Sequence, residues 1–444
     1  MARSSDTIFA LSSGRLPSGV AVVRISGPQA GATAIALAGA VPPARLARFG
    51  LLRAPDGAAL DKGLMLFFPG PASATGEDTL ELHLHGGRAV VAAVLRTLGE
   101  FAGLRPAEPG EFTRRAHLNG KMDLAEVEGL ADLIAAETEA QRRQALALAS
   151  GLLSRTVAGW RARLIRALAL VEATVDFSDE GDVPEELTGP ALQEVALLRD
   201  ELRAALADAD RGERVRDGLT IAISGPPNAG KSTLLNRLAG REAAIVSHVP
   251  GTTRDILEVH LELAGQAVTL IDTAGLRETT DEVEAEGVRR AKARAASADL
   301  VLWLSADRTE PPADLAHAVR VRTKCDLDTG GSGAPGEGAQ DAALAISAAT
   351  GEGLDALIQK IAAQAEILGG SEPALITRAR QRHALAEAGV HLERALTASA
   401  GSAIGEEILA EDLRLAARAL DAVVGRVDVE DVLDALFRTF CIGK

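Results

Sequence analysis

The 444-residue sequence contains no tyrosine, and aromatic residues make up only 2% of it. With so few aromatic rings, the chain lacks the stacking surfaces on which proteins hold single-stranded nucleic acid. It also lacks any run approaching the roughly 20 apolar residues that span a bilayer. Residues 1–13 include Asp6 and have no long apolar core, which is unlike a signal peptide. We therefore expect a cytoplasmic protein that is not a membrane protein.

Cysteine is scarce as well, because only Cys325 and Cys441 are present and they lie far apart. This usage is typical of a reducing compartment and not of a disulfide framework. The net charge of −15 argues against a broad phosphate-binding surface, so any RNA contact has to be local or supplied by a partner. The length predicts two to four domains.

One stretch carries a specific chemical signal. An apolar run over residues 219–223 is followed by GPPNAGKS at 225–232 and then by leucines with helical spacing. Strand, glycine-bounded loop and helix form the context of a phosphate-binding loop, whereas a plain glycine-rich turn lacks these flanking elements. Lys231 can reach the β- and γ-phosphates, and the Ser232 hydroxyl can ligate Mg²⁺. The stretch predicts nucleoside triphosphate binding.

Three further strand-and-loop units follow this loop. The first carries Gly251, Thr252 and Thr253, where a threonine hydroxyl can bind Mg²⁺ only while the γ-phosphate is present. The second is a buried strand that ends in Asp272 and continues as Thr273, Ala274 and Gly275. Asp272 would hold Mg²⁺ through water, and the N–H of Gly275 would contact the γ-phosphate.

The third unit carries Thr323, Lys324 and Asp326, and Ser347-Ala348 follows the next strand. The order of all these motifs indicates a translation-factor-type GTPase, in which Asp326 would select guanine. Threonine replaces the usual asparagine at 323, so an amide that braces the base pocket is lost. GTP is the expected nucleotide.

The machinery for hydrolysis differs from that of Ras-like proteins. Leu276 follows DTAG where a water-orienting glutamine is soon expected, and no arginine finger in cis is evident. Such a finger contributes about 10³–10⁵-fold, so another group has to replace it. Asn228 offers a neutral oxygen that could hold a monovalent cation beside the phosphates.

The rest of the chain predicts an α/β and all-α multidomain protein. Residues 1–120 are predicted to form a mixed α/β domain. Apolar residues follow helical spacing over 121–215 and 373–444, which predicts a helical domain with a G domain inserted at 216–372. Because each helical part offers one apolar stripe, we expect the two parts to pack on each other. In TLELHLH, Glu81, His83 and His85 share one strand face, either as a metal or acid–base site or as a solvated face.

The sequence resembles the tRNA modification GTPase family MnmE (TrmE) over essentially its whole length. The resemblance rests on VVRISGP, FPGPASATGEDTLELHLHGG, RPAEPGEFTRRAHLNGKMDLAEVE, GREAAIVSHVPGTTRD, DTAGLRETTDEVEAEGVRRA and the terminal FCIGK. It implies an N-terminal α/β domain that binds tetrahydrofolate and dimerises, a helical domain made of two segments, and an inserted Ras-like P-loop G domain.

The resemblance also implies ligands for particular residues. Arg24, Glu81, Lys121 and Lys444 would approach a tetrahydrofolate derivative (5,10-methylene or 5-formyl), with Cys441 as a candidate catalytic thiol or an inert one. Glu284 would orient the attacking water, although a solvated helix charge is the alternative. A K⁺ ion would be held by Asn228, Ser247, Val249 and Thr252. The full set expected around GTP, Mg²⁺ and K⁺ comprises Asn228, Ala229, Gly230, Lys231, Ser232, Thr233, Ser247, His248, Val249, Pro250, Gly251, Thr252, Thr253, Asp272, Thr273, Ala274, Gly275, Thr323, Lys324, Asp326, Ser347 and Ala348.

The expected partners are a second copy of the chain, the FAD-binding protein MnmG in a heterotetramer, and tRNA. Together they would place an aminomethyl or carboxymethylaminomethyl group on carbon 5 of the wobble uridine. A ribosome-assembly-type GTPase switch is the alternative function. The basic cluster Arg378, Arg380, Arg382 and His383 could meet tRNA phosphate or simply begin a solvated helix.

Overall fold

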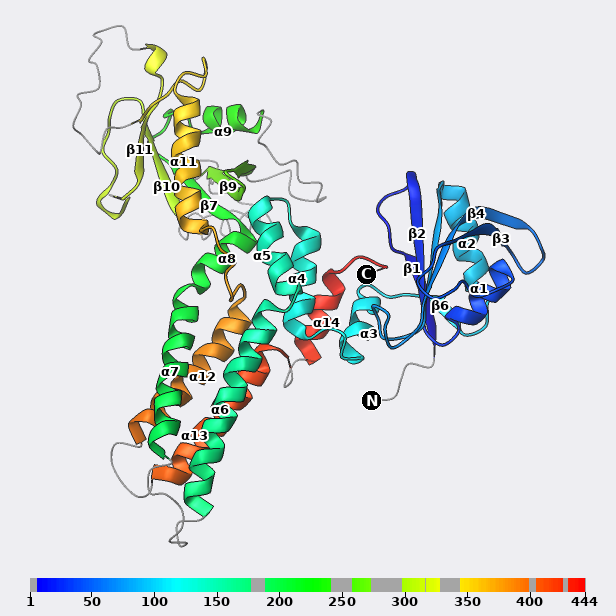
Figure 1. Ribbon diagram of the computed structural model, residues 1–444. Helices are drawn as coiled ribbons and strands as arrows, with labels where there is room; N and C mark the ends of the chain where they lie inside the picture. Colours follow the sequence, from blue (N-terminus) through cyan, green and yellow to red (C-terminus); the bar gives the residue numbers. More distant parts are fainter. Residues whose placement is uncertain are drawn as a thin grey trace, which may run out of the picture. The chain divides into compact units, whose positions relative to one another are not determined.

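The computed structural model describes residues 6–176, 188–240, 258–272, 298–315, 317–327, 344–398, 405–425 and 430–443. It divides into two compact units, shown as ribbons in Figure 1. The first unit comprises Met1–Ala131, Ser154–Arg161 and Ala417–Lys444, and the second comprises Asp132–Leu153 and Ala162–Ala416. Among the described residues, no helix combines the length and apolarity that a membrane crossing needs.

The first unit contains a six-stranded sheet in the order β3-β4-β5-β2-β1-β6. Only the pairing of β1 with β6 is parallel. The strands are β1 (Thr7–Leu11), β2 (Ser18–Ser26), β3 (Arg48–Arg53), β4 (Ala59–Phe68), β5 (Thr79–Gly86) and β6 (Leu104–Pro106). Along β5, Leu80, Leu82 and Leu84 are buried, as the alternation of TLELHLH predicts.

Helices α1 (Ala30–Ala38) and α2 (Arg88–Gly99) complete the core of this sheet. Further along come α3 (Glu111–Leu118), α4 (Leu124–Ala135) and, near the end of the chain, α14 (Glu430–Thr439). Phe437 and Phe440 pack with Val127 of α4 in a small buried cluster. Gly110, at the start of α3, has φ 67°, and an added Cβ there would lie 2.6 Å from the Phe437 carbonyl oxygen. This glycine allows α14 to approach α3 closely.

The second unit contains another six-stranded sheet, in the order β12-β11-β10-β7-β9-β8. All its pairings are parallel except that of β8 with β9. The strands are β7 (Leu219–Ser224), β8 (Glu258–Leu263), β9 (Gln266–Asp272), β10 (Leu300–Ser305), β11 (Val319–Arg322) and β12 (Leu344–Ala345). All of them lie inside the predicted G domain, whose exact boundaries stay a prediction.

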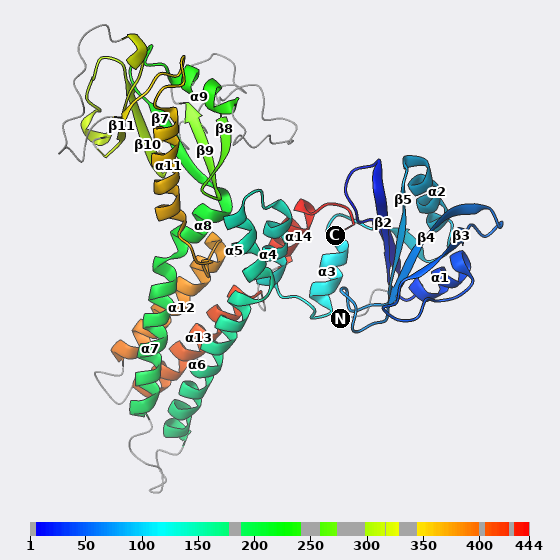
Figure 2. The same ribbon diagram turned by 45° about the horizontal axis from the view of Figure 1, so that its top comes forward.

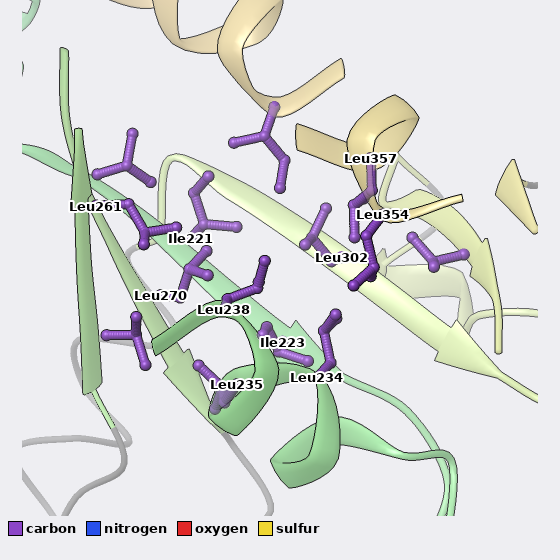
Figure 3. Packing of buried hydrophobic residues seen from close by; sticks show 14 of the residues in the cluster. Ile221, Ile223, Leu234, Leu235, Leu238, Leu261, Leu270, Leu302, Leu354 and Leu357 are labelled. Carbon is purple, nitrogen blue, oxygen red and sulfur yellow. The ribbon is translucent and has the colours of Figure 1, made fainter. Parts of the chain in front are cut away.

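Helices α9 (Lys231–Ala239) and α11 (Leu354–Gly369) supply leucines to the core of this sheet. Figure 3 shows Leu234, Leu235 and Leu238 facing Ile221 and Ile223 of the central strand. Because β7 is flanked by parallel strands and covered by apolar side chains, it reads in sequence as a continuous apolar run. The loop that leaves β7 is therefore held by a rigid base.

The helical part of the second unit contains segments from both sides of the insertion. Its helices include α5 (Glu139–Ala149), α7 (Thr188–Ala207), α8 (Ala209–Asp217) and α12 (Ala379–Ala398). Two further helices, α6 (Leu152–Asp176) and α13 (Gly405–Val423), have residues in both units. Figures 1 and 2 both show α7 beside α12, and Arg199 and Glu393 pair across them at 3.5 Å. The predicted packing of the two helical parts is confirmed here.

The chain enters the inserted domain through α8 and leaves it after α11. The entering segment contacts the leaving segment backbone to backbone, because an added Cβ on Gly212 would lie 1.9 Å from the carbonyl oxygen of Ile376. Gln144 of α5 joins them, because its amide nitrogen donates to the Gly212 carbonyl at 3.0 Å while its amide oxygen accepts from the N–H of Ala374 at 3.4 Å.

Candidate functional site

The loop between β7 and α9 depends on two glycines that have different tasks. Gly225 has φ 147°, and an added Cβ would lie 2.1 Å from the carbonyl oxygen of Leu304 on the neighbouring strand β10. Gly230 has φ 89°, but an added Cβ would meet no atom within 4 Å. Gly225 is therefore needed for close backbone approach, and Gly230 for the left-handed turn that starts α9. The N-terminus of α9 offers unpaired N–H groups to an anion.

Lys231 folds back over this loop. Its ammonium group donates to the carbonyl oxygens of Gly225 at 2.7 Å and Pro226 at 2.8 Å, and the residue is 6% exposed. Burial lowers the pKa of Lys231, and the nearby Asp272 carboxylate opposes that shift. An incoming phosphate would offer this cation stronger acceptors than two neutral carbonyls.

The residues expected at Mg²⁺ lie together at the end of β9. The Ser232 hydroxyl donates to the Asp272 carboxylate at 2.8 Å, and Asp272 is only 1% exposed. A hydroxyl beside a carboxylate fits the hard oxygen ligands that Mg²⁺ prefers. The next predicted ligand, Thr253, lies outside the described residues.

The predicted base-binding loop, residues 323–326, is hydrogen-bonded to the phosphate loop. The Thr323 hydroxyl donates to the carbonyl oxygen of Ala229 at 2.7 Å, with both residues buried. Asp326 is exposed, as a residue that meets a base would be. Ser347 is buried, and its hydroxyl accepts from the N–H of Thr350 at 3.2 Å. The amide expected from an asparagine is absent, but a hydroxyl forms one bracing bond in its place.

The structure thus brings together the described members of the predicted nucleotide site, from the phosphate loop to Asp272 and the base loop. Asn228 stands in the phosphate loop with φ 61°. The remaining predicted members lie outside the described residues; they are Ser247, His248, Val249, Pro250, Gly251, Thr252, Thr253, Thr273, Ala274, Gly275, Glu284 and Lys444. Their roles stay predictions.

In the first unit, Arg24 and Glu81 are direct partners across β2 and β5. Their charged groups pair at 2.9 Å, and Glu81 also lies 3.4 Å from the His83 ring. His85, in contrast, is highly exposed and pairs with Asp61 at 2.8 Å. Among the described residues, no group of three or more His, Cys, Asp or Glu side chains is placed to hold a metal ion. Glu81 and the two histidines therefore do not converge on one point.

Lys121 and Cys441 take other positions in this unit. The Lys121 ammonium donates to the Pro71 carbonyl at 3.1 Å. Cys441 is exposed, and the next residue, Ile442, forms an antiparallel bridge with Pro109. The Ser12 hydroxyl then donates to the Gly443 carbonyl at 2.8 Å, which holds the tail against the end of β1. Sequence patterns gave no signal for Ser12, which lies 431 residues from its partner.

A buried ion network in the same unit was also missed. Arg115 pairs with Asp6 at 2.9 Å, Glu77 at 3.1 Å and Glu111 at 3.1 Å, and Arg105 also binds Glu111. Burial alone would raise the pKa of Glu111, but hydrogen bonds from Arg105, the Glu108 N–H and Arg115 outweigh it and lower the pKa. The network joins the loop before β5 to α3 and β1.

The basic cluster at the start of α12 is engaged with acids. Arg378 pairs with Asp132, and Arg382 pairs with Asp210 and Glu213. These pairings favour a structural role for the two guanidinium groups over the alternative of tRNA phosphate contact.

A central parallel strand, a glycine-bounded loop that opens a helix, and a hydrogen bond from the Ser232 hydroxyl to the buried Asp272 carboxylate define a P-loop protein of the GTPase class. Two family models match the chain, "GTP-binding protein TrmE N-terminus" at residues 7–121 and "MnmE helical domain" at residues 124–441. The chain belongs to the MnmE family of tRNA modification GTPases.

Curated relatives agree with that assignment. The tRNA modification GTPase MnmE of Azorhizobium caulinodans is 71% identical over 445 residues, which cover 100% of both chains. The protein of the same name from Rhodopseudomonas palustris is 54% identical over 444 residues, covering 99% of each. Among solved structures, the G domain of the FeoB iron transporter of T. maritima is 25% identical and covers 32% of this chain and 96% of its own, with a TM-score of 0.21.

Proposed function

We propose that this chain is a K⁺-dependent, Mg²⁺-requiring GTPase that acts in the modification of the wobble uridine of certain tRNAs. In this proposal it forms a homodimer and works with the FAD-binding protein MnmG in the cytoplasm. A tetrahydrofolate derivative supplies the one-carbon unit of the aminomethyl or carboxymethylaminomethyl group. The single observation that carries the proposal is the 71% sequence identity to a tRNA modification GTPase over the full length of both chains. The geometry of the phosphate loop supports it.

The cation is proposed to sit where an arginine finger would otherwise act. Asn228 and the residues Ser247, Val249 and Thr252 would surround K⁺ when two G domains meet. A monovalent cation beside the phosphates would stabilise charge that develops during transfer. Glu284 would then orient the attacking water.

Measuring GTP turnover in KCl and NaCl tests this role. We expect turnover at least about tenfold faster in K⁺, since a finger-like charge is worth about 10³–10⁵-fold. Asn228→Ala should abolish the difference, whereas Asn236→Ala, an exposed asparagine on α9, should keep it. Equal rates in the two salts would count against the cation.

Glu284→Ala tests the water-orienting role. The variant should keep its affinity for GDP and lose turnover strongly, by about 10²-fold or more, as a general base would. Wild-type turnover in this variant would assign the carboxylate to a solvated helix position.

The tRNA function is tested by mass analysis of wobble uridine in a deletion strain complemented with this chain. Restoration of the modified base supports the proposal. Co-purification with ribosomal particles without any tRNA defect would instead favour a ribosome-assembly-type GTPase switch. Binding of 5-formyltetrahydrofolate by wild type and by Arg24→Ala tests the cofactor separately.

A further inference from the structure

The hairpin formed by β8 and β9 extends from the nucleotide site to the helical part of the second unit. Leu263 at the end of β8 pairs with Gln266 at the start of β9, which leaves a two-residue turn of Ala264 and Gly265. At its other end β9 finishes at Asp272, a member of the predicted Mg²⁺ site. Because a strand rises about 3.3 Å per residue, the turn lies about 20 Å from that site along β9.

The turn contacts the first turn of α5, a helix outside the predicted G domain. The N–H of Ala140 donates to the Gly265 carbonyl at 3.0 Å. This N–H is among the first four of the helix, which find no acceptor within the helix itself. Ala140 is only 7% exposed, so water has little access to the group. Loss of the Gly265 acceptor would therefore leave a poorly hydrated donor unpaired.

The start of β9 is also packed closely on both segments that connect the insertion to the helical part. An added Cβ on Gly369, the last residue of α11, would lie 2.6 Å from the side-chain amide of Gln266, which is 4% exposed. An added Cβ on Gly218, just before β7, would lie 3.3 Å from the Cβ of Ala267. These contacts leave little room for the hairpin to move without its neighbours.

Helix α5 is bound to the same two segments. Gln144 bonds the backbone of both of them, and the side-chain amide of Gln141 donates to the Arg216 carbonyl at the end of α8 at 3.0 Å. Figures 1 and 2 both show α5 beside α8. A displacement of the hairpin must therefore break its bond to α5 or move α5 together with both connections.

In the sequence, both ends of this hairpin lead to residues that are predicted to bind the γ-phosphate. Thr253 comes five residues before β8, and Gly275 comes three residues after β9. Both lie outside the described residues, and their roles are predictions. A γ-phosphate bound by both would draw the open end of the hairpin toward the phosphate loop, which is away from α5. Loss of the γ-phosphate would remove that pull.

We propose that the turn of the β8–β9 hairpin couples the γ-phosphate to the helical part of the chain, so that GTP weakens the contact between Gly265 and α5 and GDP restores it. This coupling rests on the γ-phosphate contacts of the proposed function and does not depend on K⁺, tetrahydrofolate or tRNA. Because coupling between two sites is reciprocal, a contact that is held closed must lower the affinity for GTP relative to GDP by the same factor.

Hydrogen exchange of the Ala140 amide in the full-length chain reports the contact without any turnover. We expect this amide to exchange at least about fivefold faster with Mg²⁺ and a non-hydrolysable GTP analogue than with Mg²⁺ and GDP. The amide of Gln141 is the matched control, because it donates to the Thr138 side chain at the start of the same helix and should change little. Equal exchange of the Ala140 amide in the two nucleotides would overturn the proposal.

A reversible cross-link tests the reciprocal effect. An added Cβ on Gly265 would lie 3.8 Å from the Cβ of Glu139, which is the mean Cβ separation across a disulfide. We expect oxidation of the double variant Glu139→Cys, Gly265→Cys to raise the Kd for the GTP analogue at least about tenfold and the Kd for GDP less than twofold. Dithiothreitol should reverse the change. The single variant Glu139→Cys, which also keeps Cys325 and Cys441, should show no effect of oxidation.

Unchanged Kd values on oxidation of the cross-linked variant would contradict the coupling, and so would an equal loss of affinity for both nucleotides. If the double variant does not fold or does not close, hydrogen exchange of the wild-type chain decides the question by itself. Wild-type protein that binds neither nucleotide would instead refute the proposed function.

Discussion

The two sheets of this protein arrange charged side chains in opposite ways. In the parallel sheet of the second unit, Lys231 and Ser232 come from one short loop and helix that follow a central strand. Their present partners are mostly backbone carbonyls and one carboxylate, which a ligand can replace. In the first unit, Arg24 pairs directly with Glu81. Arg115 pairs with Glu111 of its own helix and with Asp6 and Glu77 from distant segments.

This difference teaches where each site obtains its geometry. The nucleotide site is built from backbone conformation and contiguous residues, so its shape is encoded locally. The first unit fixes its loops through ion pairs between residues as much as 109 positions apart. Substitutions should therefore act on binding in the second unit and on folding stability in the first.

The largest expected effect on nucleotide binding comes from Gly225→Ala. The added methyl group would meet the Leu304 backbone at 2.1 Å, where nothing flexible can yield. We expect nucleotide binding to fall by about 10²-fold or more, since the strand or loop must move at a cost of about 3 kcal/mol. Titration with a fluorescent GDP analogue measures the loss.

Gly230→Ala is the matched control, because its φ is also left-handed but its surroundings are open. Gly230→Ala should weaken nucleotide binding by only about 1–2 kcal/mol, which is the backbone strain of alanine at a left-handed φ. An equal loss in both variants would show that the collision with β10 is unimportant.

Arg115→Met should lower the free energy of unfolding of the first unit by about 3–5 kcal/mol, because it leaves buried carboxylates without a partner. Nucleotide affinity should be unchanged. Arg105→Met should have a smaller effect, since Arg105 is 41% exposed while Arg115 is 5% exposed. Hydrogen exchange of β1 and β6 amides in urea follows this unit, and equal losses would contradict the burial argument.

The same network predicts a pH dependence. The folded-state pKa of Glu111 is lowered below the ordinary 4.5, so its contribution to stability is present above that value and is lost as pH falls through the lowered pKa. Glu111→Gln should be less stable at pH 7 and lose less stability on acidification.

The pKa of Glu126 is shifted in the direction opposite to that of Glu111. Burial raises its pKa, so protonation of Glu126 favours the folded state as pH falls. Glu126→Gln should make the acid loss steeper, and urea unfolding between pH 7 and pH 3 distinguishes the two variants. Parallel pH profiles would refute both assignments.

The smallest effect is expected for Ser12→Ala. Loss of the bond to Gly443 should cost about 1 kcal/mol, which corresponds to roughly fivefold faster hydrogen exchange of the Ile442 and Gly443 amides. Ser18→Ala removes an exposed bond to Val20 in the same sheet and should leave these amides unchanged. Unchanged exchange in Ser12→Ala would mean that the Pro109–Ile442 bridge alone holds the tail.

The sequence predicted most of the fold, and it predicted that the phosphate loop, Ser232 and Asp272 lie together, because both depend on local patterns. The alternating leucines of β5 mark the buried face of that strand, and the leucines that follow GPPNAGKS mark the buried face of α9. Two contacts could not be predicted. The bond from Thr323 to Ala229 joins residues 94 apart, and the network of Arg115 depends on which carboxylates the fold brings near. The motif marks Thr323 but not its partner Ala229, and nothing in the local sequence distinguishes the carboxylates around Arg115 from solvated ones.

The contact between Gly212 and Ile376 has a practical consequence for how this chain can be built. Because the entry and exit of the insertion lie against each other, a peptide of a few residues could close the gap with a small loss of chain entropy. The helical part could then be produced with the nucleotide domain deleted or exchanged for another protein. The closeness of the two ends explains physically how so long a segment can interrupt a helical domain without disturbing it.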